Sequence, residues 1–80
     1  MTIDDVFAMV RAERERVAGL VDRGVLPIAA DNPNCPDLLR LAALVEEVGE
    51  VAQCIHDGDD PTGELVQLAG VAVAWLQGIA

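Results

Sequence analysis

The chain has 80 residues, of which 52 % are hydrophobic and only 2 % aromatic, and its formal net charge at pH 7 is −9. So high an apolar fraction excludes an intrinsically disordered chain, and the negative charge argues against direct binding to nucleic acid. Eighty residues make one small domain, which buries only about 60 % of its unfolded surface. We therefore expect a homodimer or homotetramer.

The two cysteines form neither a CxxC pair nor a dense disulfide framework, and the acidic start of the chain is unlike a signal peptide. The longest uncharged run, residues 65–80, is short for a membrane span and is interrupted by glycine and glutamine. These features predict a cytoplasmic protein with no membrane segment.

The first predicted helix covers about residues 3–23, with Thr2 as its N-cap and Gly24 as its stop. Its apolar residues recur mostly at spacings of three and four: Ile3, Val6, Phe7, Val10, Val17, Leu20 and Val21. Residues 24–36 contain three prolines and two asparagines, which is typical of a loop.

The second predicted helix covers about residues 36–56, with its N-terminus at Asn34 or Cys35 and Pro36 in its first turn. Six apolar residues are spaced 3, 4, 3, 4, 3 along it: Leu38, Leu41, Val45, Val48, Ala52 and Ile55. This spacing describes one continuous stripe, which we expect to face a core.

The third predicted helix covers about residues 61–78, with Asp60 as its N-cap. It is apolar nearly all round, so it has to be enclosed by its own chain and by a partner. We predict an all-α fold for the single domain 1–80: a three-helix protomer that completes a four-helix-bundle-like core by homo-oligomerisation.

The stretch "LVEEVGEVA" places Glu46, Glu47 and Glu50 opposite the stripe of the second helix. These acids either form a solvated face or line an apolar crevice. Glu64 and Gln67, three residues apart on the third helix, would face Glu47 and Glu50 across an antiparallel pair. Such a cluster repels itself unless it is neutralised, and its hard oxygen atoms suit Mg²⁺ or Mn²⁺.

This acidic stretch, followed by "GELVQLAGVAVAWLQGI", resembles the MazG-like all-α nucleoside triphosphate pyrophosphohydrolases. The signature of that family is E-E-x-x-E, an interval, and then E-x-x-D. The resemblance covers about residues 37–79. It implies Mg²⁺-dependent hydrolysis of a nucleoside triphosphate to monophosphate and pyrophosphate, in nucleotide house-cleaning or pool control.

The resemblance also implies roles for individual residues. Glu47, Glu50, Glu64 and Gln67 would bind the metal ion, and Glu46 and Glu47 would be the catalytic residues, Glu46 as a further ligand or as the group that orients the attacking water. Gln67 departs from the family pattern, which has Asp there, and its neutral amide weakens metal binding.

Two alternatives to catalysis remain open. The chain can be a degenerate homologue that binds metal or nucleotide without turnover, or a helical oligomerisation module whose acids are merely solvated. Among the other polar residues, Arg11, Arg14 and Arg16 alternate with Glu13 and Glu15, which is typical of a solvated helix face.

Overall fold

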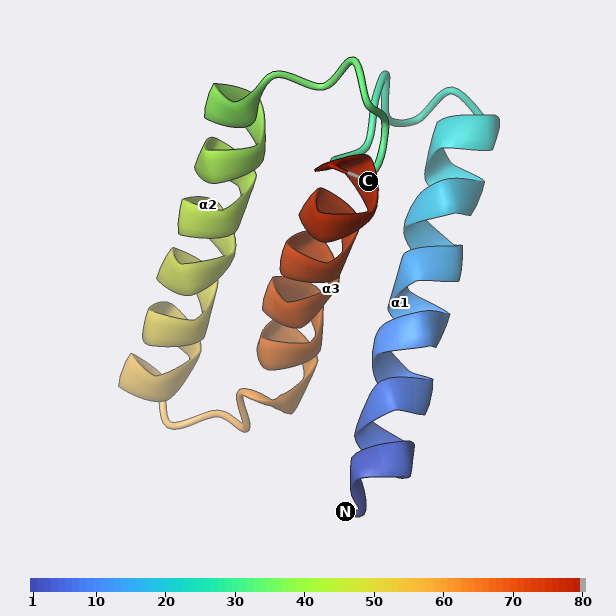
Figure 1. Cartoon of the computed structure of the whole chain (residues 1–80). Coiled ribbons are helices and arrows are strands. Elements are labelled where there is room, and N and C mark those ends of the chain that lie inside the picture. The colour runs from blue at the N-terminus through green and yellow to red at the C-terminus, as the bar shows by residue number, and fades with distance from the viewer. Residues whose placement is uncertain (80) are drawn as a thin grey trace.

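The computed structural model describes residues 1–79, and three α-helices account for most of them (Figure 1). They are α1 (Ile3–Asp22), α2 (Asp37–His56) and α3 (Thr62–Ile79), with no strand in the described part of the chain. The predicted all-α fold class is confirmed. The predicted helix boundaries agree with the structure to within one residue.

The first helix begins and ends as its sequence predicts. The hydroxyl of Thr2 accepts a hydrogen bond from the backbone N–H of Asp5, and the Asp5 carboxylate accepts one from the backbone N–H of Thr2. This reciprocal capping box satisfies two N–H groups that the helix itself leaves free. After α1, Gly24 has φ +73°, a left-handed conformation that favours glycine, and the chain turns away there.

The other two helices begin slightly later than predicted, because proline precedes each of them. Pro36 is the N-cap of α2 and has extended backbone, so neither Asn34 nor Cys35 caps this helix. Pro61 accepts a hydrogen bond from the backbone N–H of Leu65, and α3 begins one residue later, at Thr62. The Asp60 carboxylate accepts hydrogen bonds from the backbone N–H and the hydroxyl of Thr62.

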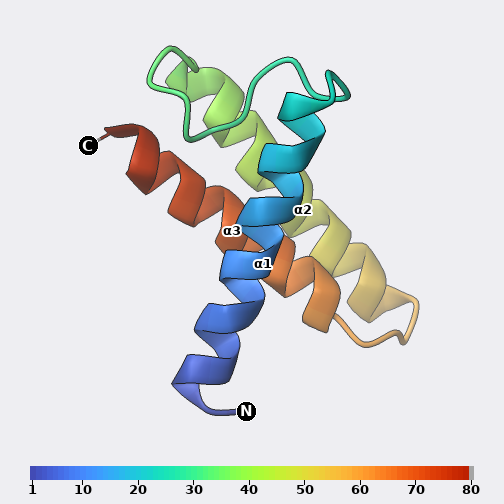
Figure 2. The same cartoon turned by 90° about the vertical axis from the view of Figure 1, so that its right-hand side faces the viewer.

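Helix α3 lies between α1 and α2 and packs against both, whereas α1 and α2 do not contact each other (Figure 1). Figure 2 shows α1 crossing α3 obliquely near the middle of α3. The buried residues of α3 are Gly70 and Ala74, one turn apart. A Cβ atom at Gly70 would lie 3.0 Å from Cγ of Glu13, so the small residue lets α1 approach α3 closely.

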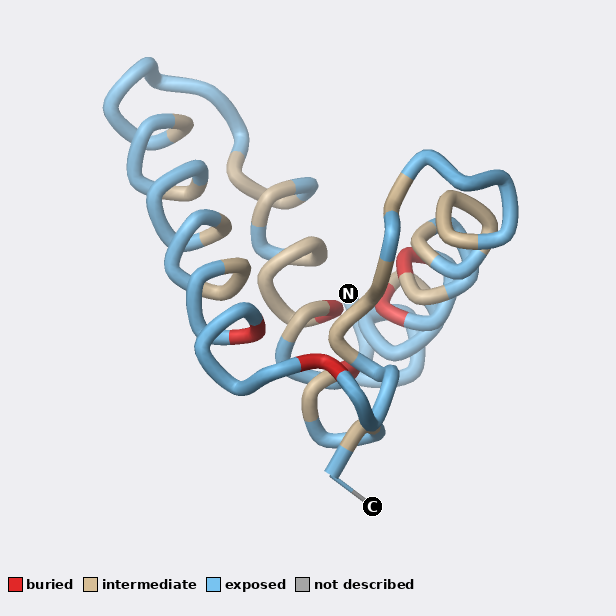
Figure 3. The backbone as a smooth tube through the Cα atoms, turned by 90° about the horizontal axis from the view of Figure 1, so that it is seen from above, coloured by how far each residue is buried: buried red, intermediate tan, exposed pale blue. Residues whose placement is uncertain are grey.

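The apolar stripe of α2, which was expected to face a core, does not face the core of its own chain. All six residues of the stripe are exposed, and the tube of α2 is largely pale blue in Figure 3. They are Leu38, Leu41, Val45, Val48, Ala52 and Ile55. The covered side of α2, the helix that contacts α3, carries one buried and five half-buried residues: Arg40, then Ala43, Leu44, Glu47, Val51 and Cys54. Since α3 is the only helix in contact with α2, only one side of α2 can be covered within the chain.

No helix within residues 1–79 combines the length and the hydropathy that crossing a membrane requires.

Candidate functional site

A cavity of 430 Å³ lies on the side of α3 where α1 and α2 diverge. Helix α3 forms its floor, α1 and α2 form two walls, and the loop after α1 forms a third. The lining residues are Glu13, Arg14, Arg16, Val17 and Leu20 of α1, residues 26–30 of the loop, Leu39, Ala42, Ala43, Glu46 and Glu47 of α2, and Gln67, Gly70, Val71 and Ala74 of α3. The volume suits a small-molecule ligand.

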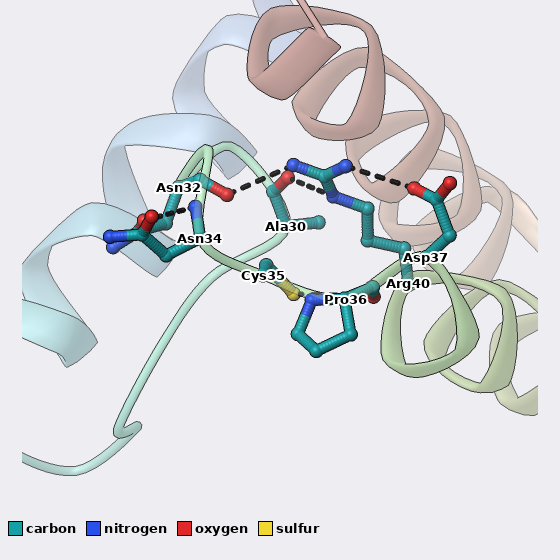
Figure 4. A network of polar contacts seen from close by, with 7 residues as sticks. All are labelled: Ala30, Asn32, Asn34, Cys35, Pro36, Asp37 and Arg40. Atoms are coloured by element: carbon teal, nitrogen blue, oxygen red, sulfur yellow. Dashed lines mark hydrogen bonds and ion pairs between the residues drawn. The ribbon is translucent and has the colours of Figure 1, made fainter.

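Arg40 holds the loop wall in place. This residue of α2 is only 5 % exposed, and its guanidinium donates hydrogen bonds to the carbonyl oxygens of Ala30 and Asn32, each at 2.9 Å (Figure 4). A third donor, Nη1, lies 3.1 Å from the carboxylate of Asp37. Each of the three guanidinium nitrogens therefore has a partner, which compensates for burying the charge.

Arg14 ties the same loop to α1 and to the end of α3. Its Nη2 lies 3.1 Å from the carboxylate of Asp31, and its Nε donates a hydrogen bond to the side-chain oxygen of Gln77 at 3.0 Å. The loop is thus fixed to both walls of the cavity. Its apolar residues, Leu26, Pro27 and Ile28, face the cavity as a preformed surface.

Glu47 brings an unusual carboxyl group to the polar end of the cavity. Its Oε2 atom is buried and has no hydrogen-bond partner in the described part of the protein. The pKa of Glu47 is raised from 4.5 to about 7, chiefly by burial, then by a hydrogen bond with Glu50 and by the negative charges of Glu50, Glu46 and Glu13. Glu47 therefore changes charge near neutral pH.

Glu13 was not expected in this site, because its alternation with arginines indicated a solvated face. The residue is only 9 % exposed and lies against Gly70. It is paired with Arg16, whose Nη2 donates to Oε2 of Glu13 at 3.0 Å. This hydrogen bond is the main reason why the pKa of Arg16 is raised, and the charge of Glu47 adds to it.

The structure brings together some of the predicted site residues and not others. Glu46, Glu47 and Gln67 all line the cavity, and Glu50 lies beside Glu47. Glu64 lies close to Cys54. The pKa of the Cys54 thiol is raised, first by burial and then by the charge of Glu64. Within residues 1–79, no three Asp, Glu, His or Cys side chains are grouped closely enough to hold a metal ion.

The sequence did not lead us to expect Glu13 or Arg40 at this site, although the position of Glu13 in its helix indicates burial. Glu13 lies three residues after Val10 and four before Val17, so it continues the apolar face of α1. Its position on that face predicts burial even though its charge argues against it. Arg40 offers no such signal, because its partners are backbone carbonyls that only the folded loop presents.

The cavity therefore combines an apolar body with a polar end that carries both acids and an arginine. It can accept a molecule with a flat or apolar part and a charged head. The carboxylates at the polar end of the cavity would require a cation or protons to neutralise them. Arg16, which is exposed at the outer edge of the cavity, can pair with an anion. Comparisons with models of known families, with curated proteins and with solved structures gave no match.

Proposed function

We propose that this protein hydrolyses a nucleoside triphosphate to a nucleoside monophosphate and pyrophosphate with the help of Mg²⁺, with Mn²⁺ as a possible substitute. The main support is the Glu47 carboxyl group, which has a buried, unpartnered oxygen at the polar end of an apolar cavity. A triphosphate bridged to this carboxylate by a cation would place the base or sugar in the apolar part of the cavity. The MazG-like signature in the sequence supports the same reaction.

The donor atoms here suit Mg²⁺ or Mn²⁺, because all of them are carboxylate or amide oxygens. In this proposal Glu47 and Glu50 bind the metal ion together with Gln67 of α3. Glu64, the fourth ligand that the signature implies, lies beside Cys54 and outside the cavity lining in this structure. The closeness of Glu50 supports this assignment, since its carboxylate contributes to raising the pKa of Glu47, and a cation between two such groups would relieve their repulsion. When bound, the metal would neutralise phosphate charge and acidify a water molecule.

The chain's own residues would position the substrate. Glu46, at the exposed edge of the cavity, would orient the water that attacks the α-phosphorus, while the bond from that phosphorus to the bridging oxygen breaks and pyrophosphate leaves. Arg16, held by Glu13, would contact the phosphates. The anchored loop 26–30 would exclude water from the base or sugar.

A second candidate, a binding-only homologue, is supported by Gln67. This side chain lines the cavity but brings no charge to a set of ligands that the signature completes with Asp. Such a protein would bind Mg²⁺ or nucleotide without releasing pyrophosphate. In both candidates the ligand belongs to the nucleotide pool, and we propose a cytoplasmic location.

The decisive experiment is a hydrolysis assay on a panel of canonical and modified nucleoside triphosphates, with Mg²⁺ or with chelator, that measures monophosphate and pyrophosphate. We expect metal-dependent release from the wild type, a loss of at least about 100-fold in Glu47→Gln, and little change in the control Glu15→Gln, an exposed acid outside the cavity. A folded wild type that binds nucleotide but releases no product would favour the binding-only homologue, and Gln67→Asp should then strengthen metal binding.

A further inference from the structure

The polar side chains of the cavity divide into a group and one residue that stands apart. Within residues 1–79, six lining side chains carry hydrogen-bonding groups, and five of them belong to the polar end: Glu13, Arg16, Glu46, Glu47 and Gln67. Arg16 is paired with Glu13, and the charges of Glu13 and Glu46 help to raise the pKa of Glu47. Arg14 is the sixth, and its partners lie elsewhere.

The guanidinium of Arg14 lies toward the loop end of the cavity. Its Nε donates a hydrogen bond to Gln77 at 3.0 Å, and its Nη2 lies 3.1 Å from the carboxylate of Asp31 in the loop. Gln77 follows Gln67 by ten residues on α3, which corresponds to about 15 Å along the helix axis. A ligand whose charged head lies at the polar end therefore extends its other end toward Arg14.

Arg14 has a donor left for such a ligand. Its side chain is only 14 % exposed, and its Nη1 makes no hydrogen bond to any part of the chain that the structure describes. Neither Asp31 nor Gln77, the acceptors that hold the other two nitrogens, is among the residues that line the cavity. Because a guanidinium only donates hydrogen bonds, Arg14 offers the ligand a donor and no acceptor.

The loop wall beside Arg14 does not supply the missing acceptors. The carbonyl oxygen of Ala29 already accepts a hydrogen bond from the backbone N–H of Asn32 at 3.1 Å, and that of Ala30 accepts one from Nε of Arg40 at 2.9 Å. The other lining side chains of the loop are apolar. An amino group placed here would lose its water without gaining a partner, whereas a carbonyl oxygen could accept from Nη1.

We propose that Arg14 is the specificity-determining residue for the base and selects a base with a carbonyl group over one with an amino group at the same ring position. Hypoxanthine and guanine, in which the carbonyl oxygen and N7 form two adjacent acceptors, meet this requirement, as do uracil and thymine. Adenine and cytosine present an amino group there. This inference rests on the proposed function, which places the nucleotide in the cavity with its phosphates at the polar end.

The test compares pairs of nucleotides of nearly equal size. Titration calorimetry with Mg²⁺ measures the binding of the α,β-imido analogues of deoxyinosine and deoxyadenosine triphosphate, and of those of deoxyuridine and deoxycytidine triphosphate. We expect the wild type to bind the carbonyl member of each pair at least about tenfold more tightly, as a hydrogen bond to a charged donor implies.

Two variants separate base selection from anchoring of the loop. Arg14→Met removes the guanidinium but keeps an unbranched side chain, and the preference within each pair should fall to about onefold. Asp31→Ala is the matched control, because it breaks the same link between α1 and the loop and keeps the guanidinium. That variant should retain the preference, and circular dichroism should show native helicity in both.

A wild type that binds both members of each pair equally would overturn the inference, and this comparison requires no variant. Arg14→Met would overturn it by weakening both members of a pair to the same extent, since Arg14 would then hold the phosphates or only the loop. Pyrophosphate release from the four parent nucleotides tests the proposed function separately. Release without preference would retain that function and reject the inference, preferential binding without release would support the inference in a binding-only homologue, and binding of none of the analogues would reject both.

Discussion

At the scale of single residues, Glu47 is the most informative position. Three acids act on it, Glu13 from α1 and Glu46 and Glu50 from its own helix, and Arg16 is the cation close by. Burial and these charges hold a proton on Glu47 at pH values where an ordinary glutamate has lost it. A cation bound at the same point would displace that proton, so metal binding and pH are linked here.

We expect the stability of the wild type, relative to Glu47→Gln, to fall as the pH rises from about 5 to 8. The raised pKa of Glu47 means that its contribution is complete below about 4.5 and is lost as the pH passes through about 7. The difference should be about 1 kcal/mol or less, because the group is partly solvated. Urea unfolding of both proteins at several pH values measures it.

At pH 8, Mg²⁺ should make the wild type more stable than Glu47→Gln. At tenfold the dissociation constant, Mg²⁺ should stabilise the wild type by about 1.4 kcal/mol, raise its melting temperature by several degrees and leave Glu47→Gln unchanged. The control Glu15→Gln should respond like the wild type. Equal shifts in all three proteins would contradict the assignment of Glu47 as a ligand.

At the scale of secondary-structure elements, side chains from α1 and α2 anchor the loop that connects these two helices. Arg40 and Arg14 fix it from opposite sides, and the end of α3 lies close to the same anchor. A Cβ atom at Gly78 would overlap Nη2 of Arg40 and lie 2.7 Å from the carbonyl oxygen of Ala30. Gly78 therefore leaves the space in which the guanidinium meets the loop.

Gly78→Ala should destabilise the protein by about 1–3 kcal/mol, because the added methyl group displaces Arg40 or the loop. The matched control is Gly63→Ala, in the same helix, where a Cβ atom would meet nothing within 4 Å. That substitution should stabilise the protein by up to about 1 kcal/mol through helix propensity. Chemical unfolding compares the two variants, and equal effects would show that Gly78 is not constrained by the anchor.

At the scale of the whole molecule, negative charge and apolar surface oppose each other. Fourteen acids are set against five arginines, so two copies of the chain would repel each other at a distance, whereas contact through the exposed, uncharged α2 stripe would favour the expected homo-oligomer. The outcome depends on ionic strength, because salt screens the repulsion and leaves apolar packing largely intact.

Raising the salt concentration from about 20 mM to about 300 mM should therefore strengthen self-association into the homodimer or homotetramer that the sequence predicts, since the Debye length falls well below the size of the molecule. A roughly tenfold decrease in the dissociation constant is expected, measured by sedimentation equilibrium. Self-association that weakens with salt would show that ion pairs, and not the apolar stripe, hold the copies together.

The sequence by itself determined the three helices, their limits and the loops between them, since apolar spacing, the Thr2 cap and the prolines act over a few residues. It also placed Glu46, Glu47 and Gln67 well enough to be found on one cavity. Tertiary structure alone decided which side of α2 meets α3, because both sides carry apolar residues and a chain with three helices covers only one of them. The burial of Arg40 was decided there too, because its partners are backbone carbonyls that only the folded loop presents, whereas the position of Glu13 on the apolar face of α1 indicated burial and only the structure showed that Gly70 covers it.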